Sequence, residues 1–360
     1  MIDNKILKWI SLHVLKLSVE EKKLAEIFLN NIKKNQSQEI DKEQFNELFN
    51  KNKQKLLGIT YTPANIRERL TDFVLKELLK EKKIKNLKII DPCCGSGLFT
   101  ITLIQKLINL GLSYKLILQK IVYFSDIDKI SVIISLINIY EYFNSLKIDI
   151  SKIKLNGRVE NFIFSEKKYD AFITNPPYVK IQNISLEDRN YLKKKYPEMF
   201  FGSMGLSTIF LKKMKDDLNE KGVLGIITQN NLFTSNSAKK LRKEIQNNIV
   251  KIETFGSNRI FKGVNAYTCL FYLQKKHKNK FEFKKINTTK DLQAKSDLIE
   301  NKKLHFSKWR LGNKKELQDI ENLEKLGVHL GDACNIWVGI ATQFDKGFTV
   351  FKKGNNWIGT

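Results

Sequence analysis

The sequence predicts a doubly wound α/β domain, preceded by a helical extension and followed by the start of a second domain. Three observations lead to this fold class. Short apolar runs typical of buried strands alternate with helical stretches between about residues 56 and 275. The first run is followed by a glycine-rich turn and an apolar helix, the opening unit of such folds. Polar residues then follow the ends of several of these strands.

Length, composition and charge limit the class of protein. The chain has 360 residues and is 42% hydrophobic, enough to bury a sizeable core. Its formal net charge of +25 favours a polyanionic partner, with nucleic acid as the first choice. The abundance of Lys, Asn and Ile is also what an AT-rich genome would encode. No signal-peptide pattern or membrane-length apolar run is present, so we expect no membrane partner.

The four cysteines have neither the spacing of a zinc site nor that of a disulfide framework. Cys93 and Cys94 are adjacent, whereas Cys269 and Cys334 stand alone. We therefore expect free thiols in a reducing cytoplasm and no metal centre.

Residues 1–55 are interpreted as a helical extension that packs on the main domain. Ser18 followed by Glu21 matches a capping box at a helix start. Further on, Thr62 and Pro63 are predicted to begin another helix, with Thr62 as its N-cap. Such a helix start can hold a carboxylate, and an ordinary capped helix is the alternative.

The apolar run 87–91 is a predicted buried strand that ends at Asp91 and leads into Pro92-Cys93-Cys94-Gly95-Ser96-Gly97. The glycines allow backbone amides to approach a ligand closely. Their spacing matches neither the dinucleotide fingerprint nor a P-loop. A carboxylate beside such a turn suits a cationic or amino-bearing ligand.

The next predicted strand, residues 120–125, ends at Asp126 and Ile127, where an acidic side chain can accept hydrogen bonds from ribose hydroxyls. Asn161 and Phe162 follow a third stretch, residues 152–159. Because the carboxyl ends of parallel strands meet at one edge of a sheet, we expect these side chains to line one ligand site.

The run 169–173 is a further buried strand, and it ends in Asn175-Pro176-Pro177-Tyr178. Each proline fixes its own φ and restricts the preceding residue, so this loop is stiff. The Asn175 amide and the Pro176 carbonyl offer two acceptors beside an aromatic ring, which suits a planar group bearing an NH₂. The alternative is a strand-ending turn with a packed tyrosine.

The remaining chain completes the domain. Lys193, Lys194 and Lys195 either follow a phosphate backbone or lie on a solvated helix. Strands are expected at 222–227, 252–255 and 267–273, with Phe261 in an exposed loop. Residues 276–325 are interpreted as a linker, and residues 326–360 as the start of a second domain. We expect the chain to be the front part of a longer protein.

The order of four motifs resembles the gamma-class, adenine-specific DNA methyltransferases of type II and type IIG restriction-modification systems. The motifs are Thr62-Pro63, Asp91 to Gly97, Asp126, and Asn175 to Tyr178. The resemblance covers residues 56–275. It implies a Rossmann-like, S-adenosylmethionine-dependent methyltransferase fold with a mixed seven-stranded sheet. Residues 326–360 then resemble the start of a truncated target-recognition domain.

The resemblance also implies a role for each matching residue. Thr62 and Pro63 lie by the methionine part of S-adenosylmethionine, and Asp91, Pro92, Gly95 and Gly97 surround its amino acid end. Asp126 and Ile127 take the ribose, and Asn161 and Phe162 meet the adenine. Asn175, Pro176, Pro177 and Tyr178 hold the target base, and Phe261 stacks on its far face. The family more often has Ala at position 93 and Asp at position 161.

The resemblance implies a cytoplasmic enzyme that methylates a flipped adenine in double-stranded DNA, with a restriction endonuclease or a specificity domain or subunit as a partner. Methylation of an RNA adenine or a protein glutamine is an alternative, because the same four-residue loop serves all three. A truncated relic that no longer turns over is a third interpretation. No acidic pair typical of a fused nuclease occurs in the first 55 residues.

Overall fold

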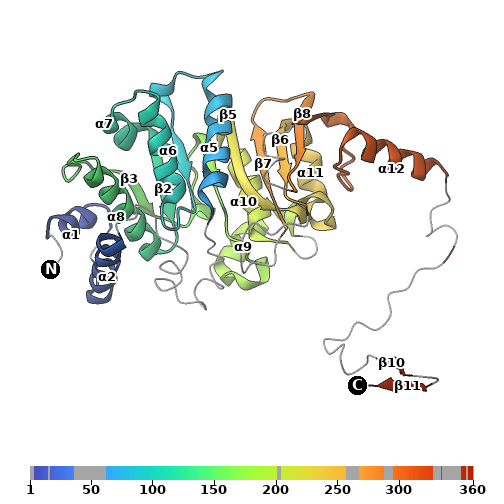
Figure 1. Cartoon of the computed structure of the whole chain (residues 1–360), viewed down its shortest axis with the longest axis horizontal. Coiled ribbons are helices and arrows are strands. Elements are labelled where there is room, and N and C mark those ends of the chain that lie inside the picture. The colour runs from blue at the N-terminus through green and yellow to red at the C-terminus, as the bar shows by residue number, and fades with distance from the viewer. Residues whose placement is uncertain are drawn as a thin grey trace. The chain divides into compact units, whose positions relative to one another are not determined.

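A computed structural model describes residues 4–14, 17–35, 62–200, 204–256, 267–287, 295–326, 334, 350–353 and 356–359. The chain divides into two compact units, Met1–Asn313 and Lys314–Thr360, which are described separately below (Figure 1).

The larger unit is built on one mixed sheet with the spatial order β3-β2-β1-β4-β5-β7-β6-β8-β9. Strands β3 to β5 run parallel, and β7 lies antiparallel between β5 and β6. The strands are β1 (Ile89–Asp91), β2 (Val122–Asp126), β3 (Asn156–Val159), β4 (Tyr169–Thr174), β5 (Leu218–Gln229), β6 (Ile249–Thr254), β7 (Thr268–Gln274), β8 (Lys280–Lys285) and β9 (Asp297–Glu300). The first seven in spatial order form the predicted mixed sheet, and β8 and β9 extend it.

Helices cover both faces of this sheet. On one face α5, α6 and α8 lie side by side over strands β2 to β5, while α10 packs on β5 from the other face (Figure 1). The helices of this unit are α1 (Asn4–Ser11), α2 (Val19–Asn35), α5 (Ala64–Leu79), α6 (Leu98–Asn109), α7 (Tyr114–Leu116), α8 (Lys129–Ser145), α9 (Leu186–Lys195), α10 (Leu206–Asp216) and α11 (Lys239–Ile245). Among the described helices, none has both the length and the apolarity to cross a membrane.

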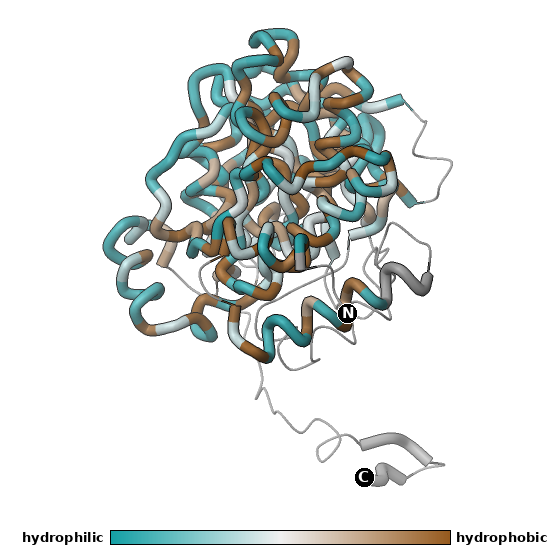
Figure 2. Tube along the Cα trace, turned by 90° about the vertical axis from the view of Figure 1, so that its left-hand side faces the viewer, coloured by the Kyte–Doolittle hydropathy of each residue, from teal (hydrophilic) through white to brown (hydrophobic). Residues whose placement is uncertain are grey.

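The core forms where the strands bury side chains on alternating faces. Val223 and Ile227 of β5 pack in the cluster with α5, whereas Leu224 and Ile226 lie on the opposite face. Gly225 allows α5 to approach closely, because a Cβ there would lie 2.5 Å from Val74. In Figure 2 the inner segments of this unit are rich in hydrophobic residues and many outer turns are hydrophilic.

The N-terminal helices pack on α8, as expected for the extension. Trp9 is buried, and its indole N–H donates to the Ile153 carbonyl at 2.8 Å. The predicted capping box is present: Glu21 N–H donates to Ser18 Oγ, and Ser18 N–H donates back to the Glu21 carboxylate. Glu21 also pairs with Lys129, the first residue of α8.

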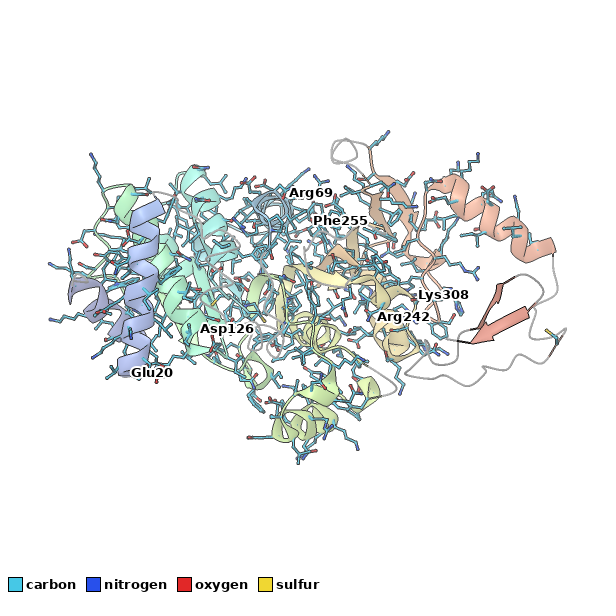
Figure 3. The ribbon with its side chains drawn as sticks, turned by 60° about the horizontal axis from the view of Figure 1, so that its bottom comes forward. Glu20, Arg69, Asp126, Arg242, Phe255 and Lys308 are labelled. Atoms are coloured by element: carbon cyan, nitrogen blue, oxygen red, sulfur yellow. The ribbon has the colours of Figure 1, made fainter. Side chains whose placement is uncertain are left out.

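The stretch interpreted as a linker, residues 276–325, instead contains β8 and β9, which join the main sheet through β6. The run Lys280–Lys285 carries enough charge to resemble a linker, but Phe281 and Phe283 alternate with polar residues and are both buried. The following loop is fixed by Arg242, which donates to the Phe306 and Ser307 carbonyls, and Arg242 lies near Lys308 in Figure 3.

The smaller unit contains α12 (Lys314–Leu326) and an antiparallel hairpin of β10 (Val350–Lys353) and β11 (Asn356–Gly359). The apolar run 336–342, which we interpret as the beginning of a recognition domain, lies outside the described residues. That interpretation therefore stays a prediction.

Arg69 on α5 forms a two-pronged pair with Glu253 of β6, whose side chain is fully buried. Replacing Arg69 with Met leaves this carboxylate with Lys251 and Tyr272 as its partners among the described residues, so we expect a loss of about 3 kcal/mol in the free energy of unfolding. Chemical denaturation measures the change. Asp72→Asn, which removes an exposed ion pair from the same helix, is the matched control and costs under about 1 kcal/mol. Equal losses in both variants would contradict the assigned role of the buried pair.

Candidate active site

A cavity of about 290 Å³ opens where the parallel strands β1, β2, β3 and β4 end. It is a concave pocket of roughly the size that small-molecule ligands occupy. Nine of the residues predicted for the site line it: Thr62, Pro92, Gly95, Asp126, Ile127, Asn161, Phe162, Asn175 and Pro177. The separate motifs of the sequence therefore meet in one place.

Five predicted residues are not part of the cavity lining: Pro63, Asp91, Gly97, Pro176 and Tyr178. They lie in or beside the segments that carry the lining residues. Phe261 lies outside the described residues.

The glycine turn is tied directly to the neighbouring strand. The Cys94 N–H donates to the Ser125 carbonyl at 2.9 Å, and the Gly95 N–H donates to the Asp126 carboxylate at 3.0 Å. Gly95 has a φ of +52°, a conformation that favours glycine. Gly97 has a φ of +81°, and a Cβ there would lie 2.8 Å from Ser135, so its role is to let α6 begin against α8.

The Asp126 carboxylate organises the tip of β2. One oxygen accepts from Gly95 and the other accepts from the Asp128 N–H at 2.9 Å. Burial raises the pKa of Asp126 to about 6. In Figure 3 Asp126 is labelled beside one end of α8. Its remaining lone pairs are suited to hydroxyl donors on a ligand in the cavity.

Asp91 is the more unusual carboxylate because one of its oxygens is unsatisfied. Oδ1 accepts from the Thr174 hydroxyl at 2.6 Å and from the Cys93 N–H at 3.1 Å. Oδ2 is buried and has no hydrogen-bond partner among the described residues. Burial raises the pKa of Asp91 to about 7. An orphaned buried acceptor next to a ligand cavity fits an ammonium group on that ligand.

The two cysteines of the turn are not reactive groups. Burial raises the pKa values of the Cys93 and Cys94 thiols, and the nearby carboxylates act in the same direction. Both stay protonated at neutral pH and are therefore poor nucleophiles.

Asn175 is held from both ends of its amide. Its Nδ2 donates to the Thr62 hydroxyl at 3.1 Å, and its Oδ1 accepts from the Tyr178 hydroxyl at 2.6 Å. Thr62 is therefore not the predicted N-cap of α5: the helix begins at Ala64 after Pro63, and no side chain caps it. The hydroxyl of Thr62 faces Asn175 instead.

Part of the cavity lining is aromatic, with Phe99, Phe162 and Phe210 among its residues. The Phe162 ring lies 5.4 Å from that of Phe210 and 5.8 Å from that of Phe172, measured between centroids. The Lys213 ammonium lies 4.8 Å from the same ring centroid. This packing fixes a flat surface at the end of the cavity nearest Asn161.

Sequence reasoning missed one wall of the cavity. It is formed by α9 and the turn before it, a stretch for which the sequence suggested only phosphate contacts or a solvated helix at Lys193 to Lys195. The lining residues are Asn183, Ile184, Ser185 and Asp188. The signal was present, because Ser185 followed by Asp188 matches the spacing of a capped helix start. In the structure the Asp188 N–H does donate to Ser185 Oγ at 3.0 Å. Arg67 was also missed; it is buried and donates to the Thr62 carbonyl.

The sequence is similar to known restriction-modification proteins. Residues 117–261 match the family model described as Eco57I restriction-modification methylase. The type II restriction enzyme and methyltransferase RM.Eco57I of Escherichia coli is 28% identical over 204 residues, which cover 52% of this chain and 20% of the relative. The type II methyltransferase M.VspI of Vibrio sp. strain 343 is 29% identical over 231 residues, covering 63% and 49% respectively. The chain thus spans half or less of these two relatives.

Solved structures share the fold. A cryo-EM structure of a DrdV–DNA complex superposes with a TM-score of 0.58 at 16% identity, covering 84% of this chain and 35% of that one. A putative class I S-adenosylmethionine-dependent methyltransferase from Listeria monocytogenes superposes with a TM-score of 0.50 at 16% identity, covering 79% and 93%. With the strand order and the glycine turn, these likenesses define the fold of the S-adenosylmethionine-dependent methyltransferases. Within that class, the chain is similar in sequence to type II restriction-modification methylases, and the matched family model covers residues 117–261.

The raised pKa of Asp91 has a consequence for stability. A carboxyl group whose pKa is higher in the folded state stabilises the fold at low pH and loses that contribution as the pH rises through about 7. Asp91→Asn removes the buried charge, so we expect the variant without ligand to gain about 1–3 kcal/mol over the wild type at pH 8. The gain shrinks as the pH falls below 7 and disappears near pH 4, where the carboxyl group of the unfolded chain is protonated as well. Urea denaturation at pH 8 and pH 4 measures it.

Asp149→Asn is the control for this experiment. Hydrogen bonds from Ser151 and then Lys5 lower the pKa of the exposed Asp149 to about 2, so its loss changes stability in the opposite direction or not at all. A gain at Asp91 that does not depend on pH would contradict the assignment.

Proposed function

We propose that this chain transfers a methyl group from S-adenosylmethionine to the exocyclic amino group of an adenine in double-stranded DNA, within a restriction-modification system. The observation that carries the proposal is the position of Asn175, which lines the same cavity as Gly95 and Asp126. A cofactor held by the glycine turn is therefore within the cavity that Asn175 also reaches.

The residues present fit such a cofactor. Asp126 keeps acceptor capacity for the ribose hydroxyls, and the orphaned oxygen of Asp91 suits the ammonium group of the methionine part. The aromatic surface at Phe162 suits a planar base. Bound S-adenosylmethionine supplies an electrophilic methyl group on a sulfonium centre.

Asn175 and Pro176 prepare the amine that receives the methyl group. The lone pair of an adenine amine is delocalised into the ring, so the amine is a weak nucleophile. Acceptors at the Asn175 amide and the Pro176 carbonyl draw its N–H bonds out of the ring plane and localise the lone pair. The rate then comes from positioning and electrostatics. The Tyr178 hydroxyl uses one lone pair of the Asn175 carbonyl, and a second lone pair remains for the substrate.

The target base has to leave the duplex to reach this cavity. In the proposal, the Tyr178 ring stacks on the flipped base, and Phe261 stacks on its other face. Tyr178 is held in place by its bond to Asn175, and its hydroxyl also lies 3.3 Å from the Ile227 carbonyl.

Charge and similarity support DNA as the partner. The net charge is +25, and Lys193, Lys194 and Lys195 are exposed in the last turn of α9, the helix whose first turn contributes Asp188 to the cavity. The relatives are restriction enzymes and methyltransferases, and one structural neighbour is a DNA complex. Base recognition and restriction are then tasks of a recognition domain, a specificity subunit or an endonuclease partner.

Two alternatives keep the same cavity. An RNA adenine or a protein glutamine offers a similar planar NH₂ group to Asn175. A protein that binds the cofactor without transferring its methyl group would be the inactive form.

A transfer assay separates these alternatives. The chain is incubated with methyl-labelled S-adenosylmethionine and duplex DNA, RNA or protein extract, and digested DNA is analysed for N6-methyladenine. The proposal expects label in DNA, in adenine. Label in protein or RNA alone overturns the DNA assignment, and cofactor binding without transfer to any substrate identifies the inactive form.

Replacing Asn175 with Ala removes the proposed acceptor, so we expect transfer to fall by about a hundredfold or more. Cofactor affinity, measured by calorimetry, stays within about threefold, because the proposed cofactor contacts come from other residues. The control is Asn231→Ala, an exposed asparagine outside the cavity lining. Full transfer by the Asn175 variant would refute its role.

Cofactor affinity should depend on pH. The cationic cofactor binds the ionised form of Asp91, whose pKa in the free protein is raised to about 7. Affinity therefore falls as the pH drops below 7, by up to about tenfold per pH unit. Calorimetry between pH 6 and pH 8 measures the slope. Asp91→Asn binds more weakly at pH 8 and shows a flatter profile; an unchanged slope in that variant assigns the titration to another group.

A further inference from the structure

Asp188 and Asn161 are in direct contact in the lining of the cavity. Asp188 lies in the first turn of α9, and Asn161 follows the end of β3. The Asn161 Nδ2 donates to the Asp188 Oδ1 at 2.9 Å, and both residues line the cavity next to Phe162. Two segments far apart in the chain are thus joined at the aromatic end of the site.

The polar atoms of Asn161 are both used within the protein. Its Oδ1 accepts from the Ile163 N–H at 3.1 Å, while its Nδ2 faces Asp188. The acceptor that the sequence suggests at this position is therefore turned toward the backbone. The amide instead orients the carboxylate of Asp188.

The second oxygen of that carboxylate is the open acceptor. Hydrogen bonds within the described residues engage Oδ1 and the backbone N–H of Asp188, and none engages Oδ2. No cation among those residues pairs with Asp188 either. A carboxylate lining a cavity beside an aromatic surface can accept a hydrogen bond from a flat ligand that carries an amino group.

We propose that Asp188 reads the exocyclic amino group of the cofactor's purine, with Asn161 as its positioning residue. The inference rests on the proposed function, because it assumes a nucleoside cofactor with its base on Phe162. An ionised carboxylate has no hydrogen to donate, so a purine with an oxo group in place of the amine sets two acceptors against each other. Asp188 therefore selects adenosine over inosine cofactors.

Calorimetric binding of S-adenosylhomocysteine and its inosine counterpart to the whole chain tests this selection. We expect the wild type to prefer the adenosine form by about tenfold or more, because the oxo analogue places its own acceptor against the Asp188 carboxylate and leaves both unpaired. In Asp188→Asn, the Asn161 donor holds the new amide oxygen, so the new NH₂ faces the ligand. This variant should lose affinity for the adenosine form by about tenfold and bind the inosine form equally well or better.

The reciprocal swap is the sharpest variant. In Asn161→Asp combined with Asp188→Asn, the amide at 188 donates to the carboxylate at 161, and its oxygen faces the ligand. The preference for the adenosine form returns, at least in part, whereas a merely structural pair would not restore it. Glu187→Gln, an exposed neighbour on α9 outside the cavity lining, is the matched control and keeps the wild-type preference.

The outcomes are distinguishable. A wild type that binds both forms equally overturns the role of Asp188 and leaves the proposed function intact. Equal loss of both forms in Asp188→Asn, with unchanged thermal stability, also overturns it. A wild type that binds neither form contradicts the proposed function itself.

Discussion

The contact on which the site depends is the amide of Asn175, held between the hydroxyls of Thr62 and Tyr178. It joins Thr62, two residues before α5, to the end of β4, and the Tyr178 hydroxyl also lies 3.3 Å from the Ile227 carbonyl of β5. Asparagine side chains otherwise rotate freely, so two partners are needed to fix the direction of its acceptor. The prolines stiffen the backbone, and these two hydroxyls stiffen the side chain.

The two carboxylates of the site are also held in position before a ligand binds, and holding them there destabilises the empty protein. Asp91 and Asp126 lie at the ends of neighbouring strands, and burial raises the pKa values of both. Holding them there disfavours the empty protein at neutral pH, and a cationic ligand offsets that cost on binding. Relief of this destabilisation adds to the favourable free energy of binding of such a ligand. The same arrangement explains why the site-forming ends of β1 and β2 are rich in hydrogen bonds from backbone N–H groups.

Much of this architecture could be read from the sequence, because buried parallel strands are continuous apolar runs and their ends are marked by Asp91, Asp126 and Asn175. Two features could not. Lys280–Lys285 looks like a charged linker, and only its burial in a sheet makes the alternation of Phe281 and Phe283 decisive. Asp188 lies in a lysine-rich helix, and a contact with Asn161 across 27 positions has no local signature. The orientation of the Asn161 amide could not be predicted either, because it is set by its hydrogen bonds with Asp188 and with the Ile163 N–H.

The packing of α1 and α2 on α8 limits how far the main domain can be shortened or transferred to another protein. Trp9 packs on Tyr140 of α8, and Glu21 anchors Lys129 at the start of that helix, three positions after Asp126. A shortened version starting at Thr62 would expose this face of α8 and remove the ion pair that holds Lys129 at its start. Protein engineers who graft this fold elsewhere should therefore carry α1 and α2 along with it.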